Sequence, residues 1–257
     1  MSIRPSEQRG RTNGDAARLC ADACRLVEAG CPARIAVLTA PPGMLELPLW
    51  RLALAAAALD GSDPVAALEH ARTADAGEPG DWAALSAVAY AQARIGWDRR
   101  VRRDAVSLLG VEGGADRDPL LEARTLLARA AEIHPSSSLW NDIGHVAGLS
   151  GDLDGARAAF LRSLALHPAD RHATINLAVL MLRAGDPHAD IMDFLGRTQL
   201  AATLPPALLL LAGGETAMAG PAEVHEWRRT TVFSYAWRRE LASRLRAASA
   251  EPGGGAP

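Results

Sequence analysis

The sequence contains no lysine, so all 27 of its basic residues are arginine. Together with abundant alanine and glycine, this usage indicates the codon bias of a GC-rich genome, which concerns origin and not mechanism. Aromatic residues are also scarce, at 4% of the chain, whereas 49% of residues are hydrophobic. A chain dominated by small aliphatic side chains favours closely packed helices.

Cysteine is rare, and its number is odd. The three cysteines are Cys20, Cys24 and Cys31, a number that does not support a disulfide framework. Cys20 and Cys24 share a helix face at i, i+4 and could chelate a metal with Cys31, but no histidine or acidic ligand recurs nearby at finger-like spacing. We expect buried, hydrophobe-like cysteines, no disulfide, no metal and no cofactor.

Strong net charge and long apolar runs are absent as well. The formal net charge is −3, which gives no global attraction to nucleic acid. No apolar run approaches the roughly 20 residues of a transmembrane helix, and charged residues interrupt the stretch after Arg11 where a signal peptide needs an apolar core. We expect a cytoplasmic protein that makes no membrane contact.

Sequence motifs of catalysis are missing too. We find no G-x-S-x-G elbow, P-loop, glycine-rich dinucleotide loop or H-E-x-x-H, and we therefore predict no catalytic residue. His134-Pro135 and His167-Pro168 recur at nearly one spacing, but both histidines end predicted helices, where their charge suits the helix dipole.

One stretch has a regular pattern of its own. Its pattern residues are Trp140, Ile143, Gly144, Ala147, Ala156, Phe160, Ser163 and Pro168. The stretch resembles a tetratricopeptide repeat (TPR), a 34-residue helical hairpin with the pattern W-x2-L-G-x2-Y, A-x3-F and P. The resemblance implies a close crossing at Gly144 and Ala156, a turn at Gly151-Asp152 and a helix end before Pro168.

Further copies lie in register on both sides. Arg171 to Leu204 repeats the pattern with a turn at Gly185-Asp186, and another copy begins at Trp50 with its turn at Gly61. The copy that opens at Trp82 is split, because its second helix matches residues 120–134 after an insertion at about residues 97–118. We therefore predict four TPR-like repeats over residues 47–204.

The predicted fold class is all-α, an α-solenoid of stacked antiparallel helical hairpins with N- and C-terminal capping helices. The flanking segments are expected to be a disordered N-terminus (residues 1–14), a helical cap (15–46), C-terminal helices (205–250) and a disordered tail (251–257). The last helix is predicted from Pro221 to about Ala248, covering the last repeat. The resemblance and the arginine usage together imply a bacterial TPR-containing protein.

Two arginine-rich surfaces have alternative readings. Residues 98–104 continue as a helix whose basic face carries Arg99, Arg100, Arg102 and Arg103. This face is either solvated or a contact for an acidic partner or phosphate. The arginines of the last helix alternate with aromatics, which suits a capping helix but also RNA or membrane contact.

The resemblance also implies a binding groove, because the first helix of each TPR unit lines the concave face. Asn141 and His145 in the third unit and His172 and Asn176 in the fourth form two polar ladders that should lie side by side. Arg51 and Tyr90 extend this line toward the N-terminus. Asn176 matches an asparagine of TPRs that clamp acidic C-terminal tails, but the clamp lysines are missing, which argues against such a ligand.

These features predict an adaptor or scaffold that binds a peptide or partner protein in its concave groove. The alternative is a biosynthetic pathway enzyme or substrate-presenting accessory protein with a polar pocket lined by histidine and asparagine. For a ligand with carboxylates, we expect protonation of His145 or His172 to tighten binding below about pH 6.5.

Overall fold

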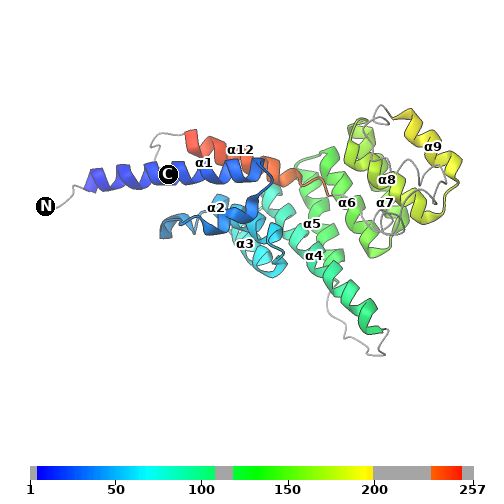
Figure 1. Cartoon of the computed structure of the whole chain (residues 1–257), viewed down its shortest axis with the longest axis horizontal. Helices are drawn as coiled ribbons and strands as arrows, with labels where there is room; N and C mark the ends of the chain where they lie inside the picture. Colours follow the sequence, from blue (N-terminus) through cyan, green and yellow to red (C-terminus); the bar gives the residue numbers. More distant parts are fainter. Residues whose placement is uncertain (1–4, 108–117, 199–232, 251–257) are drawn as a thin grey trace. The chain divides into compact units, whose positions relative to one another are not determined.

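The computed structural model describes residues 5–107, 118–198 and 233–250, and these residues contain helices and no strands (Figure 1). The chain divides into two compact units. Unit 1 comprises Met1–Pro119 and Ala236–Pro257, and unit 2 comprises Leu120–Tyr235. Within each unit neighbouring helices pack as antiparallel hairpins, so the predicted all-α, helical-repeat class is confirmed.

Unit 2 is a stack of helices in which α6, α7, α8 and α9 each pack on the next. Its helices are α5 (Pro119–Ile133), α6 (Ser137–Ser150), α7 (Leu153–Leu166), α8 (Arg171–Ala184) and α9 (His188–Arg197). Helices α6 and α8, the first helices of successive hairpins, also contact each other directly. Gly151 and Gly185 end α6 and α8 with φ angles of 90° and 77°, a left-handed conformation that glycine adopts without strain. The predicted glycine turns are confirmed.

The hairpin of α6 and α7 depends on two small residues. A Cβ atom added to Gly144 would lie 2.6 Å from ring atoms of Phe160, which is fully buried. A Cβ added to Gly148 would lie 3.9 Å from the Cβ of Ala156, an ordinary contact. The predicted close crossing exists, but Gly144 makes room for the aromatic ring, and Gly148 is the residue opposite Ala156.

Two ion pairs recur at one repeat length. Arg124 on α5 lies 2.5 Å from Asp152 in the turn before α7, and Arg157 on α7 lies 2.7 Å from Asp186 in the turn before α9. Each arginine therefore joins the second helix of one hairpin to the turn of the next. The two pairs indicate that α5 and α7 occupy equivalent places, as the predicted register requires.

Unit 1 combines the first hairpin with helices from both ends of the chain. It contains α1 (Pro5–Glu28), the 3-10 helices η1 (Pro32–Val37) and η2 (Pro42–Met44), α2 (Pro48–Asp60), α3 (Pro64–Gly77), α4 (Trp82–Ser107) and α12 (Ala236–Ala250). Helices α2 and α3 form a hairpin, and α3 packs on α4. Helix α12 packs on α1, α2 and α4 through apolar residues that include Trp237 and Leu241.

Several predicted boundaries are wrong. Helix α1 begins at Pro5 and includes part of the N-terminus expected to be disordered, because proline suits the first turn of a helix. Helix α9 ends at Arg197, before the expected Leu204. Residues 233–235 are not helical, so the last helix begins at Ala236 and not at Pro221. The part of the expected C-terminal helices at residues 205–232 and the expected disordered tail at residues 251–257 lie outside the described residues.

The last helix also lies in a different place from the one predicted. We expected it to cover the last repeat, but α12 belongs to unit 1 and packs along α1. The buried side chains of α12, which include Trp237, Leu241 and Leu245, face the helices of unit 1, and Trp237 lies beside Tyr90 of α4. Arg244 of α12 is also held by a bidentate pair to Asp81, with both distances at 2.7 Å.

Two of the cysteines lie in the contact between α1 and α12. Cys20 and Cys24 are buried, and the Cys24 thiol lies 3.3 Å from the Ala242 carbonyl oxygen. Burial raises the pKa of the Cys20 thiol. Cys31 is exposed. The buried face predicted for the two helical cysteines is confirmed.

Helix α4 runs without a break through Gly96 to Ser107, so the helix predicted at residues 98–104 is confirmed. Arg99 and Arg100 are exposed on it, whereas residues 108–117 lie outside the described part of the chain. None of the helices in the described ranges combines the length and apolar character needed to cross a bilayer.

Candidate functional site

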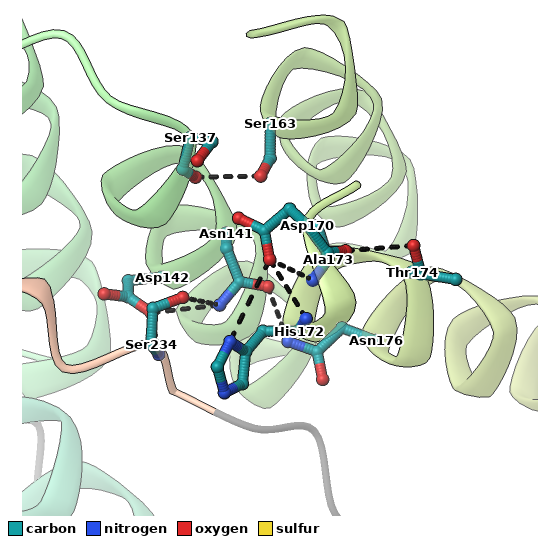
Figure 2. Close-up of polar contacts among 10 residues, drawn as sticks. All are labelled: Ser137, Asn141, Asp142, Ser163, Asp170, His172, Ala173, Thr174, Asn176 and Ser234. Carbon is teal, nitrogen blue, oxygen red and sulfur yellow. Dashed lines mark hydrogen bonds and ion pairs between the residues drawn. The ribbon is translucent and has the colours of Figure 1, made fainter. Parts of the chain in front are cut away.

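The buried amides of Asn141 and Asn176 form the centre of a polar cluster in unit 2 (Figure 2). The Asn176 Nδ2 group on α8 donates a hydrogen bond of 2.7 Å to Oδ1 of Asn141 on α6, and both residues are fully buried. One member of each predicted polar ladder, Asn141 and Asn176, therefore meets the other. We call Asn141, Asp142, His145 and Asn176 the α6/α8 cluster.

A segment from far along the chain lies on this cluster. We call Phe233–Tyr235 the returning segment. Asn141 Nδ2 donates a 2.8 Å hydrogen bond to the Ser234 hydroxyl, and the backbone N–H of Ser234 donates a 2.7 Å bond to Oδ1 of Asp142. Two adjacent side chains of α6 thus hold the hydroxyl and the main chain of one residue, as Figure 2 shows.

Asp142 is the functional candidate that sequence reasoning missed. Its side chain is fully buried, and a carboxylate buried away from water needs hydrogen-bond donors. The Ser234 amide supplies one, and Asn141 Nδ2, at 3.1 Å, supplies another. The sequence signal for Asp142 is an Asn-Asp pair within a mainly apolar helix. Asp142 is not one of the TPR pattern positions or of the predicted groove positions, so the repeat pattern does not identify it.

His145 lies one turn beyond Asn141 on α6 and forms the aromatic side of the cluster. Its ring centroid is 3.8 Å from that of Phe233, with 47° between the planes. The imidazole is 6% exposed, and burial, followed by the positive charge of Arg183, lowers the pKa of His145 to about 3. The ring is therefore neutral at physiological pH, and the expectation that His145 becomes protonated near pH 6.5 is wrong.

The returning segment ends in a strained residue. Tyr235 has a φ of 49°, in the left-handed region that costs roughly 1–2 kcal/mol for a residue other than glycine. The Tyr235 ring lies 5.7 Å from the Phe233 ring, and its side chain is 37% exposed. This residue turns the chain from the cluster into the start of α12.

Hydrogen bonds at the helix ends hold the cluster in position. Asp170 caps α8 by accepting from the backbone N–H groups of His172 at 3.0 Å and Ala173 at 3.1 Å. The Ser163 hydroxyl on α7 donates a 2.8 Å bond to the Ser137 carbonyl oxygen at the start of α6. Both contacts are at least partly buried, and they fix the two helices that carry the asparagines.

His172 is not part of the cluster. Its side chain is 43% exposed, and its Nδ1 atom lies 3.9 Å from an Asp170 carboxylate oxygen. The two histidines of the predicted pocket thus occupy different environments, because His145 is buried against an aromatic ring while His172 faces solvent at the start of α8. This separation gives no support to a histidine-lined catalytic pocket.

The remaining two predicted residues belong to unit 1, where each has partners of its own. Arg51 on α2 lies 3.3 Å from His70 Nδ1 and 3.6 Å from a Glu46 carboxylate oxygen. Tyr90 on α4 is 3% exposed, with its ring centroid 6.2 Å from that of Trp237 on α12. Tyr90 is covered by α12, and the α6/α8 cluster is covered by the returning segment, so Tyr90, Asn141 and Asn176 do not face solvent.

Comparison with models of known protein families finds no match for this chain, and no curated protein sequence matches it significantly.

Proposed function

We propose that this chain is a TPR-type adaptor that binds a non-helical peptide, or such a segment of a partner protein, at the α6/α8 cluster. The observation that carries the proposal is the contact of Asn141 and Asp142 with Ser234. In this contact α6 binds the backbone amide and the hydroxyl of Ser234 in the returning segment. A peptide ligand has a backbone amide at every residue other than proline, and a hydroxyl wherever it carries serine or threonine, so it could make the same contact. Free thiols and arginine-only basic residues support a bacterial cytoplasmic source.

The cluster is suited to binding because its polar groups are already ordered. The bond between Asn176 and Asn141 fixes the Asn141 amide, leaving its Nδ2 group directed at Ser234. A buried carboxylate that accepts an amide hydrogen makes a charge-assisted hydrogen bond, about twice as strong as a neutral one. Side chains held in place before binding lose little conformational freedom when a ligand arrives.

The test is a selection of random peptides displayed on phage against the full chain, followed by fluorescence anisotropy with the selected peptides. Asp142→Ala removes the acceptor of the peptide amide and is expected to weaken binding by about 5- to 150-fold, equivalent to about 1–3 kcal/mol. Asp154→Ala on the exposed surface of α7 is the matched control and should bind normally.

Circular dichroism and thermal unfolding establish that both variants are folded. Selected peptides that bind the folded Asp142→Ala chain with wild-type affinity would place the binding site elsewhere. Failure to select any peptide, even with the returning segment weakened by substitution, would remove peptide binding as the function.

A further inference from the structure

We propose that the ligand of the α6/α8 cluster carries an aromatic residue followed by serine or threonine, and that Phe233-Ser234 of the chain itself is a tethered competitor for the same site. This inference rests on the proposed function and specifies its ligand and its regulation. The returning segment occupies the cluster as the ligand would, because its Ser234 already forms hydrogen bonds with Asn141 and Asp142.

A ligand residue that takes the position of Ser234 must meet two chemical requirements. Its backbone N–H donates to Asp142, so proline, which lacks that hydrogen, is excluded. Its hydroxyl accepts from Asn141, whose Nδ2 group also donates to Asp142 and whose Oδ1 atom accepts from Asn176. A ligand without an acceptor here would lose this hydrogen bond from the buried Asn141 amide, at a cost in free energy. Serine and threonine meet both requirements.

The preceding position requires an aromatic ring. Phe233 lies against the neutral imidazole of His145 at a centroid distance of 3.8 Å, with 47° between the ring planes, which is closer than the roughly 4.5–7 Å usual for aromatic pairs. The charge of Arg183 acts on the same imidazole, so lysine or arginine at this ligand position would meet like charge. The site therefore selects phenylalanine, tyrosine or tryptophan before the hydroxyl residue.

Two features of the returning segment favour its dissociation from the α6/α8 cluster. Phe233 and Ser234 are only partly buried, and Tyr235 holds a left-handed backbone conformation. A peptide from a partner makes the same hydrogen bonds without that strained residue. Because the segment is covalently attached, it competes at an effective concentration on the order of millimolar. A free ligand must therefore bind tightly enough, or be concentrated enough, to displace the segment.

The test uses a fluorescein-labelled peptide with the sequence of residues 231–236, capped at both ends, and measures its binding to the full chain by anisotropy. Phe233→Ala combined with Ser234→Ala weakens the tethered competitor and is expected to tighten peptide binding at least about tenfold relative to wild type. A peptide with alanine at both the aromatic and the serine position should not bind. Adding Asp142→Ala to the double variant should weaken peptide binding by about 5- to 150-fold.

Equal affinity of wild type and the double variant, or no binding to either, would overturn the inference. If library-selected peptides bind through Asp142 while the peptide of residues 231–236 does not, this inference fails and the proposed function stands. If neither kind of peptide binds, both fail.

A second measurement covers the case in which the double variant does not fold. The Ser234 amide of the wild-type chain is bonded to Asp142 and should exchange slowly with deuterium. Millimolar peptide is expected to speed this exchange by displacing the returning segment, whereas unchanged exchange would refute the competition.

Discussion

The burial of His145 predicts that unit 2 loses stability in mild acid. The folded state holds the pKa of this imidazole at about 3, whereas an unfolded chain has an ordinary histidine near 6.5. Between these values the unfolded state binds a proton that the folded state does not. Stability is therefore complete above about pH 6.5 and falls as the pH decreases toward 3.

The size of the loss follows from the pH interval. Each pH unit below 6.5 costs about 1.4 kcal/mol while the folded histidine stays neutral, so lowering the pH from 7.5 to 5.0 should cost about 2 kcal/mol through His145. Asp152, whose pKa is lowered by the Gly155 amide and by Arg124, remains ionised throughout this interval.

Denaturant unfolding followed by circular dichroism at pH 7.5 and 5.0 measures the effect. His145→Gln should lose about 2 kcal/mol less than wild type over this interval, because glutamine does not titrate. His134→Gln, at an exposed position, is the control and should behave as wild type. His70, whose pKa is lowered mainly by burial, contributes equally to all three chains. An identical pH dependence in wild type and His145→Gln would refute the burial of a neutral imidazole.

Three further predictions concern packing, ion pairs and thiols. Gly144→Ala should lower the free energy of unfolding by about 1–3 kcal/mol because its Cβ would lie 2.6 Å from the Phe160 ring, whereas Gly148→Ala, with space for a methyl group, should be neutral or stabilising in the same thermal melts. Arg157→Ala should lower the free energy of unfolding by less than about 1 kcal/mol, since its ion pair with Asp186 is partly exposed. A larger loss in a denaturant titration would show that this ion pair contributes more than a surface pair. In a native thiol titration one group should react promptly and two only on unfolding, and prompt reaction of all three would contradict the burial of Cys20 and Cys24.

The hairpins of unit 2 could be predicted because their signals are local. Gly151 and Gly185 mark turns that require positive φ, and the small residues of α6 mark a close approach to α7. Each of these features acts over a few residues and recurs at the repeat length. The meeting of Asn141 with Asn176 followed from the same register.

The covering of the predicted groove could not be predicted in this way. Asn141 and Ser234 are 93 residues apart in sequence, and Cys24 and Ala242 are 218 residues apart. Contacts at such separations have no periodicity that a single sequence reveals. The aromatic residues near the C-terminus indicated a surface to be covered, but the repeat pattern pointed to the end of the array, and α12 packs on α1 instead.

The recurring ion pairs have a consequence for how the gene can change. Removal of residues 124–156 would place Arg157 where Arg124 now stands, and its partner Asp186 would take the place of Asp152. Recombination between equivalent helices would therefore shorten or lengthen the array by one unit without leaving an arginine or an aspartate unpaired. The excised unit would take α6 with it, together with Asn141, Asp142 and His145. Descendants of this gene are thus expected to gain or lose these three α6 residues as a block rather than one residue at a time.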